Sequence, residues 1–195
     1  MSSFPNRSLV RLRPVDETHV DFIMRWVNDR DIIGNLAAFS GKPFSREDEL
    51  AWVRRMQSSS EDRVFSIFDA VDDRYVGQCG VHQIFRRSAV GRASIIIADR
   101  AEMGRGKGSA ALASLLDFVF SSREGGGEDL HKVWLMLFAK NERARRTYAR
   151  LGFVEEALLR EEYFHEDGWH DMVRMSLLRS EWPGKVSDRA QVVRR

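Results

Sequence analysis

Residues 95–112 read IIIADRAEMGRGKGSAAL, and this stretch decides how the chain folds. A short apolar run, typical of a buried strand, leads into glycines at alternate positions, Gly104, Gly106 and Gly108. Leucine and valine then recur at positions 112, 115, 116 and 119, which is the spacing of one helix face. The stretch therefore predicts a strand, a glycine-rich turn and a helix in direct succession.

The glycine-rich turn is suited to bind an anion. Glycine permits positive φ angles and lets the backbone amides come close to a ligand. The free amides at a helix N-terminus carry partial positive charge, so phosphate is the group that they favour. Arg105 and Lys107 lie between the glycines, where their side chains would add charge-assisted contacts. A connection that binds nothing is the alternative, and it is disfavoured because alternating glycines lower helix propensity.

The spacing of the glycines does not fit the two common nucleotide motifs. A P-loop needs a glycine, four further residues and then Gly-Lys-Ser/Thr, whereas Gly104 stands two residues before Gly106, and Gly108 follows the lysine. A dinucleotide fingerprint needs Gly-x-Gly-x-x-Gly within a βαβ unit, and the glycines here recur at every second residue instead. We therefore expect a phosphate ligand of another class.

Apolar periodicity and capping residues predict the remaining elements. Asp16 and Ser45 are expected to cap helices, the second as a capping box with Asp48. Gly152 is expected to end a helix that spans residues 141–151. The predicted strands span residues 10–14, 64–70, 75–84, 92–98, 133–139, 153 onward and 171–178, and residues 121–129 are expected to form a mobile loop. This order predicts a single mixed α/β domain with helices on both faces of the sheet.

The composition excludes several classes of protein. With 43% apolar residues and one cysteine in 195 residues, the chain fits a folded domain without disulfides or a cysteine-built zinc site. It contains neither an apolar run that could cross a membrane nor a signal-peptide core, so we expect a cytoplasmic protein without a membrane partner. Residues 184–195 carry a net charge of +3 and the remainder −1, which argues against a nucleic-acid partner. Arginine outnumbers lysine 26 to 5, which indicates a high-GC bacterial source.

Three blocks of sequence, in order, resemble the GNAT acyltransferase superfamily. Residues 95–112 are similar to its acyl-CoA-binding motif, residues 131–156 resemble its second motif, and residues 161–178 resemble the C-terminal block of one branch. That branch contains the ribosomal-protein alanine N-acetyltransferases and the spermidine acetyltransferases. The resemblance covers residues 9–182 and implies a single α/β GNAT domain with a mixed, mostly antiparallel sheet and helices on both faces. Residues 183–195 are left as a basic tail, which we expect to be flexible.

The resemblance implies that the glycine-rich turn binds the pyrophosphate of acetyl-CoA. Met103 stands before the first glycine, where the family usually has Gln, Arg or an aromatic residue. The family motif can also be aligned with this sequence so that it begins at Arg105. This second alignment puts an arginine at the position before the first glycine and shifts the start of the helix by two residues. Both alignments include residues 105–109. The implied CoA-binding residues are Met103 and Gly104, the backbone amides of Arg105, Gly106, Lys107, Gly108 and Ser109, and Ile96, Ile97 and Ala98, whose open backbone groups would follow the pantetheine arm where the sheet splays apart.

The predicted helix 141–151 carries the residues that the resemblance assigns to chemistry. Tyr148 shares a helix face with Ala144 and Leu151 and is therefore expected to point inward. The resemblance implies that Tyr148 protonates the CoA thiolate and that Asn141 holds the pantetheine. A phenol suits this role because its usual pKa of about 10 is close to that of an alkyl thiol. A core tyrosine with a satisfied hydroxyl is the alternative.

The sequence defines the remaining site residues less sharply. Among the arginines of this helix, Arg146 is the first candidate for the ribose phosphate or adenine of CoA, and a solvated helix face is the alternative. His82, on the predicted strand 75–84, is the candidate base, and a hydrogen-bonded core histidine is its alternative. Glu47 and Glu49 are further candidates, while bound water often carries the proton in this superfamily.

The sequence therefore predicts an enzyme. We expect an acetyl-CoA-dependent N-acetyltransferase that transfers the acetyl group directly to a primary amine in a ternary complex, without a metal. A protein N-terminus, a polyamine and an amino sugar are all open as acceptors, and residues 47–49 supply carboxylates of the kind that a polyamine favours. A CoA-binding sensor or scaffold without turnover is the rival interpretation. The sequence also leaves room for a homodimer.

Overall fold

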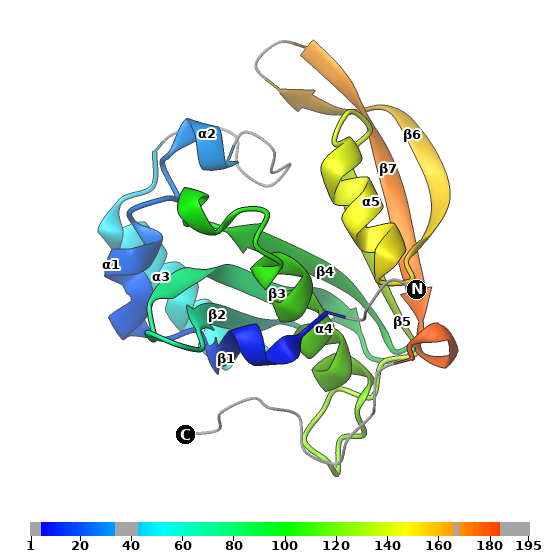
Figure 1. Cartoon of the computed structure of the whole chain (residues 1–195), viewed down its shortest axis with the longest axis horizontal. Coiled ribbons are helices and arrows are strands. Elements are labelled where there is room, and N and C mark those ends of the chain that lie inside the picture. Colours follow the sequence, from blue (N-terminus) through cyan, green and yellow to red (C-terminus); the bar gives the residue numbers. More distant parts are fainter. Residues whose placement is uncertain (1–4, 34–42, 166–167, 184–195) are drawn as a thin grey trace.

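The computed structural model describes residues 5–33, 43–165 and 168–183, and its centre is a seven-stranded sheet (Figure 1). The strands run in the order β1-β2-β3-β4-β5-β7-β6, and every neighbouring pair is antiparallel except β4 and β5. The mixed, mostly antiparallel sheet is thus confirmed. The strands are β1 (Val10–Pro14), β2 (Arg63–Asp69), β3 (Tyr75–Phe85), β4 (Val90–Ile97), β5 (Lys132–Phe138), β6 (Val154–His165) and β7 (Gly168–Leu178).

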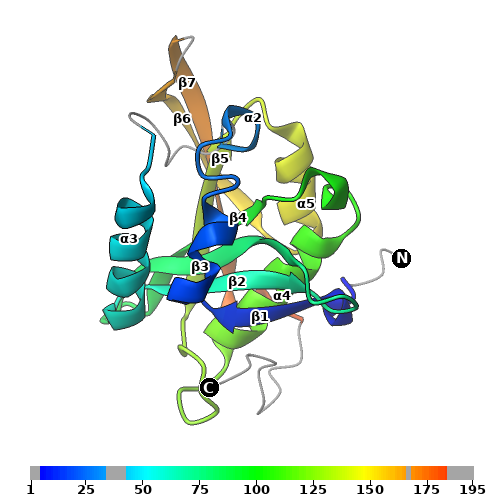
Figure 2. The same ribbon diagram turned by 90° about the vertical axis from the view of Figure 1, so that its left-hand side faces the viewer.

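Helices cover both faces of the sheet, as expected (Figure 2). Successive side chains of a strand point to opposite faces, so Phe65 and Cys79 pack on the α4 side while Val64 and Ile96 pack on the α1 and α3 side. No helix in the described ranges is long and apolar enough to span a membrane. The helices are α1 (Val20–Ile23), α2 (Arg30–Ile33), α3 (Arg46–Ser58), α4 (Lys107–Phe120) and α5 (Glu142–Arg150), with short 3₁₀ turns at η1 (Arg7–Leu9), η2 (Glu17–His19), η3 (Arg100–Glu102) and η4 (Arg179–Glu181).

The predicted capping residues explain where the helices begin. The Ser45 hydroxyl accepts a hydrogen bond from the Asp48 amide at 3.1 Å, and the Asp48 carboxylate accepts one from the Ser45 amide at 2.9 Å, so the capping box before α3 is confirmed. Asp16 caps η2, which leads directly into α1, and Asn141 caps α5. On α4 the predicted apolar face, residues 112, 115, 116 and 119, is buried.

The structure departs from the sequence-based expectation in a few elements. The apolar stripe from Val20 to Val27 predicts one helix, but α1 ends at Ile23 and the chain continues as turns. Helix α2 has no counterpart among the predicted elements, because a single helical turn is too short to show periodicity. Strand β7 begins at Gly168 instead of residue 171.

Two segments were predicted to be mobile, the loop of residues 121–129 and the C-terminal tail. Residues 121–129 contain no helix or strand, yet Glu128 within them is buried and pairs with Arg63 at 2.6 Å and with Arg86. These two ion pairs tie the loop to β2 and to the turn after β3. The flexible tail was expected over residues 183–195, and all of it but residue 183 lies outside the described residues.

The sheet opens between β4 and β5. These parallel strands pair over three positions only, from Val90 opposite Lys132 to Arg92 opposite Trp134. Beyond Arg92, β4 remains paired with β3 and β5 remains paired with β7. Two half-sheets therefore diverge from a short common seam, as Figure 1 shows. The splay that the resemblance implied is present.

Candidate active site

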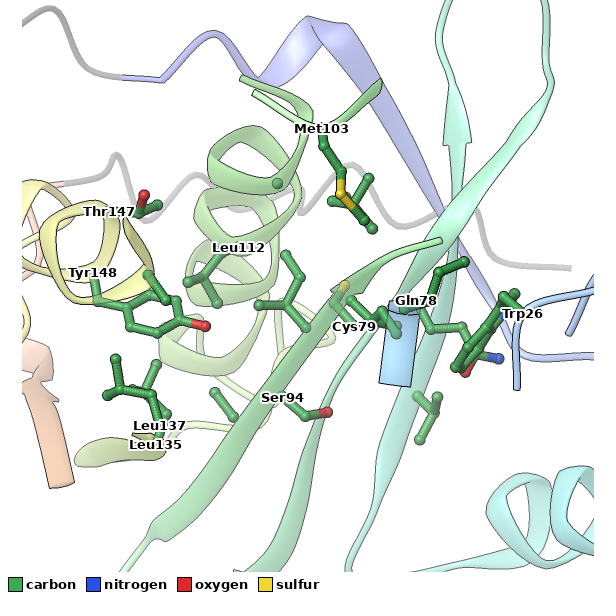
Figure 3. Close-up of a pocket in the computed structure, with 18 of the residues that line it drawn as sticks. Trp26, Gln78, Cys79, Ser94, Met103, Leu112, Leu135, Leu137, Thr147 and Tyr148 are labelled. Carbon is green, nitrogen blue, oxygen red and sulfur yellow. The ribbon is translucent and has the colours of Figure 1, made fainter. Parts of the chain in front are cut away.

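A cavity of about 1530 Å³ occupies the opening between the half-sheets. Residues of β3 and β4 line one side, residues of β5 and α5 line the other, and the glycine-rich turn and the start of α4 also contribute. Trp26 and residues of α3 lie on the side away from Tyr148 (Figure 3). Single-ligand pockets usually measure about 300–1,000 Å³, so this cavity has room for two substrates.

The glycine-rich turn presents backbone amides to the cavity. Gly104 and Gly106 have φ angles of +85° and +84°, which favour glycine, and Gly106 is the residue before α4. The Ala110 amide donates to the Gly106 carbonyl at 2.9 Å and makes the first hydrogen bond of the helix. The amides of residues 106–109 precede that bond, so they have no acceptor within the helix. We call these four amides the amide nest.

The Lys107 side chain does not contribute to this nest, contrary to the sequence-based expectation. Its ammonium group is buried between two carboxylates, in an ion pair with Asp69 and in another with Glu102 at 2.7 Å. The hydrogen bond from Lys107 lowers the pKa of Asp69 to about 2, so this pair is ionised at neutral pH. The lysine thus anchors the start of α4 to β2 instead of reaching a phosphate.

Arg105 is also placed differently from the expectation. Its side chain is exposed, and its backbone amide donates to the Glu102 carbonyl at 3.3 Å. Neither Arg105 nor Lys107 is among the described residues whose atoms line the cavity, whereas Met103, Gly104 and Gly106 do so. The donors that remain from the predicted set are therefore the amides of the nest, of whose residues Gly106, Gly108 and Ser109 line the cavity.

Strand β4 offers backbone groups along the cavity, although Ala98 does not take part. The Ala98 amide donates to the Val76 carbonyl at 2.8 Å and so belongs to the β3 ladder. Backbone groups of successive strand residues point to alternate sides, which directs those of Ile96 toward β3 and those of Ile95 and Ile97 toward the opening. Ile95, Ile96 and Ile97 line the cavity. The open backbone positions are thus Ile95 and Ile97, so that of the expected residues Ile97 faces the opening while Ile96 and Ala98 face β3.

Tyr148 projects into the middle of the cavity from α5. Its hydroxyl points between Leu112 of α4 and Leu137 of β5 (Figure 3), and its ring packs against the core cluster that includes α4. The ring packs against Phe153 with centroids 5.9 Å apart. Burial raises the pKa of Tyr148 to about 12, so its hydroxyl stays protonated through the neutral range and is able to donate.

The other predicted residues of α5 divide into two groups. Asn141 lines the cavity, and its side-chain oxygen caps the helix by accepting from the Ala144 amide at 3.1 Å. Arg146 pairs with Glu142 at 3.5 Å, is exposed, and is not among the described cavity residues. Arg143 lines the cavity instead, with its Nη2 atom 3.2 Å from the position that a Cβ on Gly104 would occupy. Residues 143, 147 and 150 all line the cavity, and this helical spacing is the signal that separates Arg143 from Arg146.

His82 lies on the opposite face of the half-sheet from α4 and lines the cavity together with Ser94. Its Nδ1 atom is 3.1 Å from the Asp62 carboxylate and its Nε2 atom is 2.8 Å from the Ser94 hydroxyl. Burial lowers the pKa of His82, and the hydrogen bond with Asp62 opposes that change only in part. The imidazole is therefore neutral at pH 7.

The α3 side of the cavity holds two buried polar side chains. Glu49 is buried, and burial together with the charge of Asp48 raises its pKa to about 7, whereas Glu47 is exposed and does not line the cavity. Gln78 on β3 is also buried, and its Nε2 atom has no hydrogen-bond partner among the described residues. The sequence interpretation did not include Gln78, although an amide in the middle of an otherwise apolar buried strand is a detectable signal.

Among the residues that the structure describes, no group of three or more His, Cys, Asp or Glu side chains is arranged to hold a metal ion.

Comparison with known proteins finds a matching family and several relatives. The chain matches the acetyltransferase (GNAT) domain family over residues 10–154. It is 27% identical over 180 residues to the spermidine N(1)-acetyltransferase of Vibrio cholerae, across 90% of this chain and 96% of that protein. It is 31% identical over 109 residues to the putative ribosomal N-acetyltransferase YdaF of Bacillus subtilis, across 55% of this chain and 57% of that protein.

Solved structures of acetyltransferases are also similar to this chain. The crystal structure of spermidine N-acetyltransferase from Vibrio cholerae in complex with CoA and spermine superposes with a TM-score of 0.81 at 25% identity, covering 91% of this chain and 99% of that one. A dodecameric structure of the Vibrio cholerae enzyme in an intermediate state superposes with a TM-score of 0.74, covering 89% and 95% of the two chains.

Proposed function

The chain belongs to the GNAT acetyltransferase family and is an acetyl-CoA-dependent N-acetyltransferase, and from this premise we propose that its acceptor is a polyamine. The catalytic domain spans residues 9–182 in this proposal. The observation that carries it is the α3 side of the cavity, which the buried Glu49 carboxyl lines together with Trp26 and Trp52. A carboxylate and aromatic faces are the groups that bind ammonium ions.

The opposite side of the cavity is the proposed site for CoA. The amide nest binds the pyrophosphate, because four backbone N–H groups at a helix start match its charge. The open backbone groups of Ile95 and Ile97 hold the pantetheine as a neighbouring strand would, and Asn141 contacts it from α5. Arg143, beside Gly104, takes the role expected of Arg146 and pairs with a CoA phosphate.

The proposed chemistry is direct transfer between the two substrates. The amine nitrogen forms a bond to the acetyl carbon, and the bond between that carbon and sulfur breaks. Tyr148 donates its proton to the leaving thiolate, since its hydroxyl points into the cavity and remains protonated at neutral pH. His82 accepts the proton that the substrate ammonium group must lose before its nitrogen attacks, because its neutral imidazole lines the same cavity.

A homo-oligomer is part of the proposal. The Vibrio cholerae relative is described as dodecameric. In this chain, Phe164 and Trp169 form an exposed aromatic pair on the β6–β7 hairpin, with ring centroids 5.3 Å apart. Exposed apolar patches of this kind often mark contacts between subunits.

Thiol release from acetyl-CoA across a panel of amines tests the acceptor. The panel contains spermidine, spermine, a peptide with an N-terminal alanine and an amino sugar. We expect kcat/KM for the polyamines to exceed that for the peptide and the sugar by about 10-fold or more, since only the polyamines bring a second ammonium group. A preference for the peptide would contradict the polyamine proposal, and CoA binding without thiol release from any amine would favour the rival sensor.

Glu49→Gln is expected to raise KM for spermidine by about 10-fold at pH 8, the size of effect that one charge-assisted hydrogen bond gives. Because the pKa of Glu49 is raised from 4.5 to about 7, its carboxyl is largely neutral at pH 6 and ionised at pH 8. Alkyl ammonium groups stay charged over this range, since their pKa lies near that of lysine at about 10.4. Wild-type KM should therefore fall as the pH rises from 6 to 8, and Glu49→Gln should abolish that trend.

The matched control is Glu47→Gln. Glu47 lies on the same helical turn and its substitution removes the same charge, but its side chain is exposed and away from the cavity. KM measured at saturating acetyl-CoA should stay within about twofold of wild type in this variant, as is usual for an exposed surface position. Equal effects of the two substitutions would show that only the overall charge of α3 matters.

A further inference from the structure

Three polar side chains form a hydrogen-bonded row on the α3 face of the half-sheet. Asp62 immediately precedes β2, His82 lies on β3 and Ser94 lies on β4. Asp62 Oδ1 is 3.1 Å from His82 Nδ1, and His82 Nε2 is 2.8 Å from Ser94 Oγ. The row thus crosses the strands and ends at a side chain that is exposed in the cavity.

The sheet makes room for this row at Gly80. Gly80 pairs with Val64 on one side and with Ser94 on the other, so it lies on the same face as His82. A Cβ placed there would lie 3.2 Å from His82 Nε2 and 2.7 Å from the Arg63 carbonyl oxygen. The absence of a side chain at position 80 lets the imidazole lie across the strand and reach Ser94.

The charges around the row fix which atoms carry protons. Burial raises the pKa of Asp62, but hydrogen bonds from Ser59 and His82 outweigh burial and leave the pKa below its usual range. An ionised Asp62 needs a donor, so the neutral imidazole carries its proton on Nδ1 and leaves Nε2 as an acceptor. The positive charge of Arg92, the other ionic group that acts on His82, further favours the neutral ring. The Ser94 hydroxyl therefore donates to Nε2 and turns its lone pairs to the cavity.

We propose that this row is a proton relay for the acceptor amine, in which Ser94 Oγ touches the substrate ammonium and His82 stores its proton. This inference rests on the proposed N-acetyltransferase reaction. Ser94 receives a proton from the ammonium group as its own proton passes to Nε2, which leaves a neutral amine and an imidazolium paired with Asp62. After the C–N bond forms, the amide nitrogen returns a second proton to the Tyr148 phenolate. Ammonium and thioester thus give amide, thiol and one proton, which His82 releases to water.

The same three residue types activate a serine nucleophile in hydrolases, but the placement of Ser94 favours a relay. Its side chain lies on the α3 face, and its hydroxyl points away from Tyr148 (Figure 3). A serine that attacked the thioester would have to face the proton donor of the leaving sulfur. The α3 face is instead the side on which Glu49 and Gln78 lie.

The test compares Ser94→Ala, Asp62→Asn and His82→Gln in kcat, in CoA affinity by calorimetry and in the pH profile of kcat. We expect a loss of about 10²-fold for His82→Gln, at the lower end of the range that acid–base groups contribute, and a smaller loss of about 10-fold for Ser94→Ala. CoA affinity should be unchanged, since the row is remote from the amide nest. Ser94→Thr, which keeps a hydroxyl, should recover most of the loss. In the wild type kcat should rise with pH as His82 becomes neutral. The pH profile of His82→Gln should lack this rise in kcat.

A second acceptor distinguishes a relay from a structural role. A diamine whose ammonium pKa lies below the assay pH is already neutral, so the losses in Ser94→Ala and His82→Gln should shrink to about threefold or less with it. If these variants lost kcat equally with both acceptors, the proton relay would be contradicted, while the proposed N-acetyltransferase activity would remain supported. An acetyl group found on Ser94 by mass spectrometry after incubation without amine would also overturn the relay. Absence of wild-type turnover with every amine would instead reject the proposed function itself.

Discussion

Tyr148→Phe is expected to lower kcat by about 10²-fold while the Kd for CoA stays within about twofold of wild type. The substitution removes one hydroxyl that points into the cavity and keeps the ring that packs on Phe153. Without a proton donor, the sulfur must leave as a free thiolate. Because burial holds the Tyr148 pKa at about 12, the wild type should show no loss of activity from tyrosine ionisation below about pH 10.

The measurement combines steady-state thiol release with calorimetry of CoA binding. Tyr163→Phe is the matched control, because Tyr163 loses the same hydroxyl on β6, away from the described cavity residues. With an acetyl thioester analogue whose thiol is more acidic, the difference in kcat between Tyr148→Phe and wild type should become smaller, since a better leaving group depends less on a proton donor. A wild-type kcat in Tyr148→Phe, or a gap that is the same for both thioesters, would remove Tyr148 from the chemistry.

Gly106→Ala is expected to raise the Kd for CoA by about 10-fold. Gly106 has a φ angle of +84° and directly precedes α4. A side chain costs about 1–2 kcal/mol in this left-handed region, and 1.4 kcal/mol corresponds to a factor of ten in affinity. The cause is conformational, because an added Cβ would lie 3.7 Å from its nearest neighbour, Leu9 Cδ1. When the backbone at Gly106 rotates to relieve the strain, the nest amides no longer point to one centre.

Gly152→Ala provides the control for strain as such. Gly152 has a φ angle of +98° after α5, and its added Cβ would lie 3.4 Å from Leu177 Cδ1, which is ordinary contact. It is not among the described residues that line the cavity. Both variants should lose thermal stability, but only Gly106→Ala should lose CoA affinity. Equal Kd values in the two variants would contradict the amide nest.

The sequence was sufficient for most elements of the fold, since local signals fix them. The capping box of Ser45 and Asp48 and the buried face of α4 depend only on residues a few positions apart. The glycine-rich turn was found for the same reason. Helix α2 could not be found in this way, because its four residues show no period.

The predictions that needed correction depend on distant partners. Lys107 lies between two loop glycines, which suggests a phosphate contact, but Asp69 comes from a strand 38 residues away and binds it. The row from Asp62 to Ser94 likewise requires the register of three strands, which a single sequence does not reveal. His82 was identified as a candidate, yet its two partners were not. The residue types were read correctly from the sequence, but the partners that these residues contact come from distant strands and could not be inferred.

The short seam between β4 and β5 has a mechanical consequence for the whole molecule. The N-terminal and C-terminal halves of the sheet are joined by a parallel ladder that ends at Arg92 opposite Trp134 and by the shared core around α4. A ligand that hydrogen-bonds to Ile97 on one side and contacts α5 on the other bridges the two halves beyond the end of that ladder. Binding of a ligand in the opening therefore also holds the two halves of the sheet together.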